Sequence, residues 1–178
     1  GAGLQAWQAA GGELTDRAEP SRFQSNFTLQ APLARLVSTD EVARSLQGGR
    51  QTLVDARAPA RFRGEVEPLD PVAGHIPGAL NRPFSENLGP DGRFKPAGEL
   101  RAEFEQLLLG RDPSALVHHC GSGVSAVPNL LAMEVAGLGR SGLYAGSWSE
   151  RCRDPSRPVA TGCASVRAHH EGGRVTPA

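Results

Sequence analysis

The sequence predicts an α/β fold, an open parallel sheet with helices on both faces. Short apolar runs that suit buried strands alternate with segments of helical periodicity between residues 38 and 144. The chain has 178 residues, which is enough for one domain with a sizeable core. Its 22 glycines and 14 prolines indicate many loops without low complexity.

A capping box starts the first predicted helix. Ser38 is the N-cap and Glu41 lies three residues on, ahead of an apolar stripe. The apolar run at residues 52–55 suits a buried parallel strand. A brief helix is expected at residues 59–62 and a second short strand at residues 79–81.

The alternation continues toward the C-terminus. Residues 99–108 form an amphipathic helix and residues 115–119 the next strand. A helix is predicted over residues 125–137, because Pro128 is tolerated only in a first helical turn. Residues 142–144 form the last short strand.

The chain divides into four parts. Residues 1–20 hold a short apolar helical stripe with no partner segment nearby, and residues 21–32 form a polar linker. The compact domain covers residues 33–160, and residues 161–178 are expected to be a disordered tail. Because the first residue is glycine, we expect the natural N-terminus to be missing, which leaves a targeting signal open.

Composition excludes several classes of function. The 19 basic side chains (Lys and Arg) balance 19 acidic ones, so the chain lacks the charge of a nucleic-acid binder or of a polybasic membrane patch. The sequence contains no apolar run long enough for a transmembrane helix. Three cysteines are too few for a disulfide scaffold, which favours a reducing, cytoplasmic location.

Cys120 and the loop after it are the most informative feature. The cysteine ends a predicted strand, and Gly-Ser-Gly-Val-Ser then leads into a helix. Ligands collect at the carboxyl ends of parallel strands, and such a loop directs backbone N–H groups toward one centre. This setting favours the thiolate, so the pattern predicts a nucleophile that needs no histidine. The alternative interpretation is that Cys120 is unreactive and serves only as a small buried apolar residue at the end of a strand.

Spacing excludes other reactive sites. A cysteine phosphatase would need arginine where the chain has Ala126, and the outer glycines of a Gly-x-Ser-x-Gly elbow are absent around Ser122. His118 and His119 are adjacent on a strand and point to opposite faces, so they are poorly placed to chelate one metal. With the remaining cysteines and histidines they make no zinc spacing, so no metal site is expected.

Three motifs, taken in order, resemble the rhodanese family of sulfurtransferases. They are Gly74–Ala79 (Gly-His-Ile-Pro-Gly-Ala), Cys120–Ala126 (Cys-Gly-Ser-Gly-Val-Ser-Ala) and Tyr144–Glu150 (Tyr-Ala-Gly-Ser-Trp-Ser-Glu). The resemblance covers residues 33–160. Gly-Ser-Gly after the cysteine is similar to 3-mercaptopyruvate sulfurtransferases, whereas thiosulfate-preferring relatives generally carry basic residues there. Residues 1–20 resemble the close of a preceding rhodanese module, so we expect a C-terminal catalytic half whose first domain is missing here.

The resemblance implies sulfur transfer through a persulfide on Cys120, from 3-mercaptopyruvate or thiosulfate to a thiol or cyanide, with no metal or organic cofactor. Backbone N–H groups of the loop would hold the persulfide anion: those of Gly121, Ser122, Gly123, Val124 and Ser125. The Ser122 hydroxyl either donates to the departing enolate, or relays a proton, or makes a simple loop hydrogen bond. A second interpretation is a non-catalytic persulfide carrier or binding module that lacks its partner domain.

The same resemblance matches Arg61 to an arginine that binds the carboxylate of mercaptopyruvate. The family often has a second arginine in a Glu-Pro-Arg-Asp stretch, where this chain has Leu69, and Arg63 could reach into the site instead. The alternative for both arginines is a solvated surface position. The chain departs from the family again at Arg151, where relatives tend to carry an aromatic residue.

Three further residues are expected to support the site. Asp55, at a strand end, should pair with an arginine and order the following loop. His75 lies in the Gly-His-Ile-Pro-Gly turn and is expected to be structural rather than a base. Trp148 should pack against the cysteine loop from a neighbouring strand end.

Overall fold

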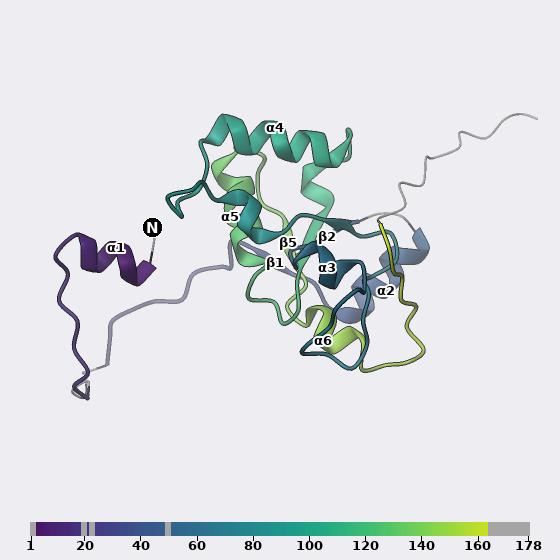
Figure 1. The fold of residues 1–178 in the computed structure, drawn as a ribbon, viewed down its shortest axis with the longest axis horizontal. Helices are drawn as coiled ribbons and strands as arrows, with labels where there is room; N and C mark the ends of the chain where they lie inside the picture. Colours follow the sequence, from purple (N-terminus) through teal and green to yellow (C-terminus); the bar gives the residue numbers. More distant parts are fainter. Residues whose placement is uncertain (1–2, 19–20, 22–23, 49–50, 164–178) are drawn as a thin grey trace, which may run out of the picture.

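The structure is a computed structural model that describes residues 3–18, 21, 24–48 and 51–163 (Figure 1). It confirms the predicted α/β fold. Five parallel strands form one sheet in the order β1-β5-β4-β2-β3. The strands are β1 (Arg35–Leu36), β2 (Thr52–Asp55), β3 (Leu80–Asn81), β4 (Leu116–His119) and β5 (Gly142–Leu143).

Helices flank the sheet on both sides. In Figure 1, α4 and α5 lie on one side, and α2, α3 and α6 lie on the other. The helices are α1 (Gly3–Ala9), α2 (Thr39–Gly48), α3 (Pro59–Phe62), α4 (Ala97–Leu108), α5 (Val127–Val135) and α6 (Ser147–Arg151), with 3-10 turns at η1 (Phe84–Asn87) and η2 (Pro113–Ala115).

The element boundaries follow the sequence closely, with two exceptions. The capping box of α2 is formed as predicted: the Ser38 N–H donates to Glu41 Oε2 at 2.8 Å, and the Glu41 N–H donates to Ser38 Oγ at 3.3 Å. Helix α5 begins at Val127, two residues later than expected, because the chain first makes the bends and turns of residues 121–126. Strand β1, of two residues, and helix α6, of five residues, were not predicted.

The two faces of the sheet are buried in separate cores. Side chains alternate along a strand, so neighbours in β2 and β4 face opposite sides. Leu53 and Val117 pack in the core beside α2, α3 and α6, whereas Val54 and Leu116 pack in the core beside α4 and α5. Because both faces are covered, the strand ends are the places where a ligand can reach the sheet.

Helix α1 lies apart from the sheet in Figure 1, and none of its residues is buried. The predicted origin of residues 1–20 and the predicted linker at residues 21–32 stay predictions. Within the predicted C-terminal tail, residues 164–178 lie outside the described residues. Among the helices that the structure describes, none combines the length and apolar character needed to cross a membrane.

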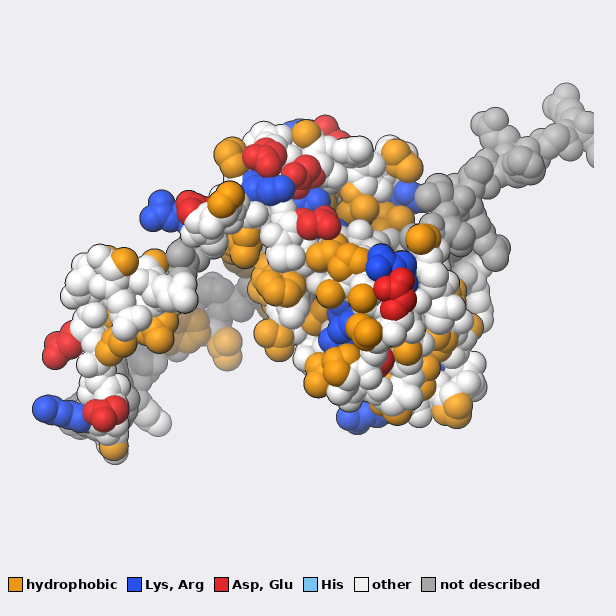
Figure 2. Space-filling view, viewed as in Figure 1, with side chains coloured by type: hydrophobic (Ala, Val, Ile, Leu, Met, Phe, Trp, Pro, Cys, Tyr) orange, Lys and Arg blue, Asp and Glu red, His pale blue; other side chains and the backbone are white. Residues whose placement is uncertain are grey.

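Charges of both signs are mixed over α4. Figure 2 shows acidic and basic side chains next to one another on this part of the surface. Lys95 lies 2.6 Å from Glu103, and Arg101 lies 2.9 Å from Glu105. This pairing agrees with the zero net charge of the chain.

Arg151, at the end of α6, is a buried arginine with 1% of its surface exposed. Its Nη2 donates to the Pro158 carbonyl at 3.3 Å, but Nε and Nη1 have no hydrogen-bond partner in the described part of the chain. Burial lowers the pKa of this guanidinium. A buried charge without full compensation costs stability, so Arg151 is a destabilising residue in the core.

Replacing Arg151 by methionine should therefore raise the free energy of unfolding, by about 1–4 kcal/mol. Urea unfolding followed by circular dichroism measures the change. Arg140→Met is the matched control, because Arg140 is about half exposed beside Glu134. A lower free energy of unfolding for Arg151→Met would show that the guanidinium stabilises the fold.

His118 is buried in β4, where Nε2 lies 3.1 Å from Met133 Sδ and the ring meets Phe104 edge-on. Its Nδ1 has no hydrogen-bond partner among the described residues. Burial, reinforced by the neighbouring His119 and Arg82, lowers the pKa of His118 from 6.5 to about 3. The folded chain therefore keeps this imidazole neutral over a pH range in which the unfolded chain protonates it.

Since only the unfolded chain binds this proton between about pH 6.5 and 3, stability should fall as the pH falls through that range. The expected loss from this histidine is about 2 kcal/mol between pH 6.5 and 5. His118→Leu should lose correspondingly less over the same interval. Urea unfolding at both pH values measures the difference, and equal losses in wild type and variant would contradict the assignment.

Candidate active site

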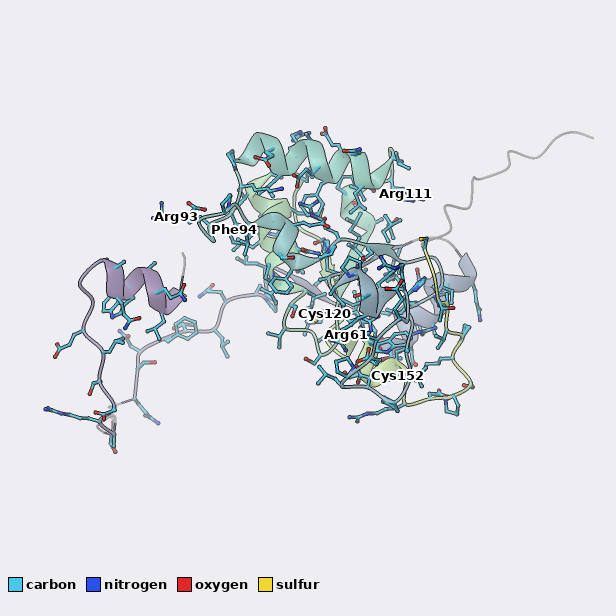
Figure 3. The ribbon with its side chains drawn as sticks, in the orientation of Figure 1. Arg61, Arg93, Phe94, Arg111, Cys120 and Cys152 are labelled. Atoms are coloured by element: carbon cyan, nitrogen blue, oxygen red, sulfur yellow. The ribbon has the colours of Figure 1, made fainter. Side chains whose placement is uncertain are left out.

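A cleft of about 540 Å³ opens at the carboxyl ends of β2 and β4. The chain that follows these two strands supplies most of its walls: Ala56, Arg57, Ala58 and Arg61 after β2, and Cys120, Gly121, Ser122 and Ser125 after β4. The remaining lining residues are Leu69, Asp70, Phe84, Ser149 and Arg153. Cys120 is 2% exposed, and Figure 3 shows it beside Arg61.

The start of α6 holds the backbone of the cysteine in place. Ser147 Oγ accepts the N–H of Cys120 at 3.1 Å, and the N–H of Trp148 donates to the carbonyl of Cys120 at 3.0 Å. The N–H of Ser149 donates to the carbonyl of Gly121 at 2.8 Å. These three hydrogen bonds, which we call the α6 clamp, fix the position of Cys120 relative to a helix that the sequence did not reveal.

The loop of residues 121–126 keeps its amide hydrogens unpaired. None of its six backbone N–H groups donates to an acceptor within the described part of the chain, although its carbonyls at Gly121, Val124 and Ala126 accept hydrogen bonds. Backbone donors are almost always satisfied, so unpaired ones at the start of a helix await solvent or a ligand. The loop can therefore bind an anion next to Cys120.

Gly123 gives the loop its shape. Its φ is 82°, in the left-handed region that side chains disfavour, and a Cβ at this position would overlap the carbonyl oxygen of Ala145. Gly121 is less restricted, since a Cβ there would make an ordinary contact with Arg61 Nη1 at 3.5 Å. This distance also locates Arg61 beside the loop.

Two carboxylates orient Arg61. Its Nε and Nη2 donate to Glu67 at 3.2 and 2.6 Å, and Nη2 also lies 3.3 Å from Asp70. Although burial opposes the effect, hydrogen bonds from Arg61 and from the N–H groups of Leu69 and Asp70 lower the pKa of Glu67. Glu67 therefore stays ionised, and it leaves Nη1 as the edge of Arg61 that faces the cysteine loop.

Asp55 is paired with Arg57, not with Arg61. Both carboxylate oxygens of Asp55 accept from Arg57, at 2.7 to 3.1 Å, and Arg57 also donates to Glu67 and to the carbonyl of Gly74. The guanidinium lies over the Trp148 ring, 4.9 Å from its centroid. Every nitrogen of this buried side chain donates to at least one acceptor, so the main role of Arg57 is to order the loop after β2.

Four other side chains named from the sequence do not line the cleft: those of Arg63, His75, Trp148 and Val124. Arg63 pairs with Glu65 at 2.6 Å on the exposed surface. His75 is buried and stacked on Phe62, with Nδ1 2.7 Å from the Phe62 carbonyl, and burial lowers the pKa of His75. Trp148 is buried in the core and donates from Nε1 to the carbonyl of Val72 at 2.8 Å. The Val124 side chain is 73% exposed.

Ser147, Ser149 and Arg153 are site residues that the sequence analysis missed. Ser149 and Arg153 line the cleft and Ser147 holds Cys120, because β5 lies beside β4 and brings the start of α6 against the cysteine loop. The Gly-Ser-Trp motif marked this segment, but the motif alone did not assign contacts to its members. Among the described residues, no group of three or more His, Cys, Asp or Glu suits a metal ion.

Comparison with known proteins gives a consistent picture. Residues 38–154 match the family model of the rhodanese-like domain. A Pseudomonas aeruginosa protein described as a probable 3-mercaptopyruvate sulfurtransferase is 51% identical over 160 residues, covering 90% of this chain and 56% of that protein. Thiosulfate sulfurtransferase of Mus musculus is 34% identical, with 90% and 55% covered. Sulfur carrier protein TtuD of Thermus thermophilus is 31% identical, with 90% and 60% covered.

The chain thus spans little more than half the length of these curated relatives. Among solved structures, the anaerobic ergothioneine biosynthesis enzyme of Chlorobium limicola, in complex with trimethyl histidine, is similar with a TM-score of 0.76 at 26% identity. The match covers 90% of this chain and 40% of that one. A structure of EanB, similar with a TM-score of 0.76 at 25% identity over 90% of this chain and 40% of that one, holds ergothioneine covalently linked with a persulfide cysteine.

Gly123→Ala should destabilise the loop for two reasons, the left-handed backbone and the contact with the Ala145 carbonyl. The backbone alone costs about 1–2 kcal/mol, and we expect Gly123→Ala to cost more. Gly92→Ala isolates the backbone cost, because Gly92 has a φ of 73° and open space around a Cβ. Urea unfolding compares the two variants, and equal losses would show that the contact with Ala145 relaxes freely.

Proposed function

This chain belongs to the family of rhodanese-like domains, and we propose that it transfers a sulfane sulfur through a persulfide on Cys120. The observation that carries the proposal is the loop of residues 121–126, whose N–H groups have no acceptor in the described part of the chain. A row of fixed donors beside a cysteine suits a thiolate and, one sulfur further out, a persulfide anion. The names of the relatives support the same chemistry.

In the first step, the Cys120 thiolate attacks the sulfur of the donor. With 3-mercaptopyruvate, the new S–S bond forms while the carbon–sulfur bond breaks, and the electron pair leaves on the enolate of pyruvate. The enolate takes up the proton of the donor thiol and becomes pyruvate. With thiosulfate, the S–S bond of the donor breaks and sulfite leaves with the electron pair. Both donors leave a persulfide anion on Cys120.

In the second step, an acceptor removes the outer sulfur. Cyanide or a thiolate attacks that sulfur, the S–S bond to Cys120 breaks, and the electron pair returns to Cys120 as a thiolate. The products are thiocyanate or the persulfide of the acceptor. The enzyme ends in its starting state, so the cycle needs no external oxidant or reductant.

Arg61 and Ser122 are the side chains that we assign to the donor. Arg61 contacts it through Nη1, because Glu67 and Asp70 engage the other edge of the guanidinium. The Ser122 hydroxyl, which lines the cleft, donates to the oxygen of the departing enolate. Arg63 has no part in this mechanism, because it lies outside the cleft in a pair with Glu65.

We also propose a cytoplasmic location and a first rhodanese module in the same polypeptide. Reducing conditions suit the three free thiols Cys120, Cys152 and Cys163. The resemblance of residues 1–20 to the close of a rhodanese module supports the second point.

A sulfur carrier that exchanges persulfide with a partner protein is the second candidate. The likeness to the sulfur carrier protein TtuD favours it. So do three apolar side chains around the cleft and its loop, Leu69, Phe84 and Val124, which are exposed as they are in protein contact surfaces. A carrier would accept sulfur from a protein persulfide and would turn over small donors poorly.

Intact-mass spectrometry after separate incubation with 3-mercaptopyruvate and with thiosulfate tests the proposal. We expect a gain of one sulfur atom, lost in Cys120→Ser and retained in Cys163→Ser, whose thiol is exposed. Cyanide should then remove the added sulfur as thiocyanate. No gain with either donor would overturn turnover of small donors and leave the carrier as the better interpretation.

A further inference from the structure

The two walls of the cleft differ in charge. On the Arg61 wall, the guanidinium groups of Arg57 and Arg61 face three carboxylates, those of Asp55, Glu67 and Asp70. This wall is therefore neutral to slightly negative, and one carboxylate of a donor would meet three others close by. Leu69, 78% exposed at the cleft, stands where the related Glu-Pro-Arg-Asp stretch would add a second positive charge.

The segment that includes and follows α6 also lines the cleft, and it holds an arginine without an ion-pair partner among the described residues. Arg153 lines the cleft and is exposed, and it forms no ion pair or side-chain hydrogen bond with any residue that the structure describes. The adjacent Asp154 is occupied by Arg157 at 3.3 Å and by the hydroxyl of Ser156 at 2.6 Å. The charge of Arg153 is thus fully available to a ligand in the cleft.

Ser149 completes this wall. Its N–H is part of the α6 clamp, which fixes the residue relative to Cys120, and the residue also lines the cleft. A hydroxyl and a guanidinium on one wall match the two oxygens of a carboxylate or of a sulfonate-like end group. Arg153 can be recruited without breaking an ion pair, whereas Arg61 cannot turn further into the cleft without leaving Glu67.

We propose that Arg153, with the hydroxyl of Ser149, forms the subsite that binds the anionic end of the sulfur donor. The ligand class is a small donor with a terminal oxyanion, the carboxylate of a 2-oxo acid or the oxygens of thiosulfate. The inference rests on the proposed sulfur transfer and assigns its specificity to the α6 side of the cleft. Arg153 supplies the second positive charge that relatives carry at the position of Leu69.

The test is the donor dependence of Cys120 loading, measured on the full chain by mass spectrometry at increasing concentrations of each donor. Arg153→Gln should raise the half-saturating concentration about tenfold or more, which corresponds to loss of a charge-assisted hydrogen bond. The maximal loading rate should stay within about twofold, because Arg153 binds the end of the donor remote from the transferred sulfur. Arg140→Gln, which removes a half-exposed arginine that does not line the cleft, is the matched control.

Two further variants separate binding from a structural role. Adding Leu69→Arg to Arg153→Gln should restore part of the affinity, since it returns a guanidinium to the cleft from the other wall. The rate at which neutral iodoacetamide alkylates Cys120 should be the same in all these variants, because it depends on the cysteine loop and on no anion subsite. A changed alkylation rate in Arg153→Gln would assign the residue a structural role and overturn the proposal.

The outcomes also distinguish this inference from the function on which it rests. If the wild-type chain loads with neither donor, the proposed function fails irrespective of Arg153. If the wild type loads and Arg153→Gln saturates at the wild-type concentration with both donors, the function stands and the subsite is wrong. A rise with 3-mercaptopyruvate alone identifies a carboxylate subsite, and a rise with both donors identifies a general oxyanion subsite.

Discussion

The α6 clamp is the interaction on which the site depends. It joins the N–H and carbonyl of Cys120 and the carbonyl of Gly121 to the consecutive residues 147–149. The position of the nucleophile relative to α6 is therefore fixed. Ser147 makes this possible at a cost, because its φ of 55° is unfavourable for a side chain by about 1–2 kcal/mol. Its hydroxyl offsets that cost by accepting from Cys120 and donating to the Tyr144 carbonyl at 2.9 Å.

Glu67 organises the other side of the cleft in a similar way. Its buried carboxylate binds Arg57 and Arg61 together, and it also accepts the N–H groups of Leu69 and Asp70. Removing this carboxylate would take away the one acceptor that Arg57 and Arg61 share and would leave buried guanidinium N–H groups without partners. The ion-pair network therefore fixes the loop after β2, and the consequence is that Arg61 has one free edge rather than a whole guanidinium to offer.

The sequence predicted those parts of the site that depend on a local pattern. Cys120 could be found because strand, glycine-containing loop and helix follow one another within a short segment. Spacing alone could not rank Arg57, Arg61 and Arg63, because it does not say which of them meets Asp55 or Glu67; only the family resemblance singled out Arg61. In the structure, Arg57 is in a buried ion pair, Arg61 lines the cleft and Arg63 is in a surface ion pair. These positions depend on where residues 65–74 fold back.

The contribution of α6 to the cleft could not be predicted from the sequence, for a different reason. Ser149 and Arg153 reach the cleft through the strand order, which sets β5 beside β4, and no local pattern encodes that neighbourhood. For Arg151, by contrast, the sequence identified an unusual residue, and the structure shows what its consequence is. At position 151, where relatives tend to carry an aromatic residue, this chain has a buried cation whose Nε and Nη1 have no partner among the described residues.

A cysteine in this setting can act without a basic partner. The adjacent His119 is fully buried, its Nδ1 lies 3.4 Å from the carbonyl of Cys120, and burial lowers the pKa of His119, so its ring is neutral. Neither proposed step needs a proton from the protein, because the donor thiol supplies the one that pyruvate takes up. What both steps need is stabilisation of an anion that moves by one sulfur atom along the loop. Amide dipoles fixed by the backbone meet that need for thiolate and persulfide alike, whereas a single imidazolium would favour one of them.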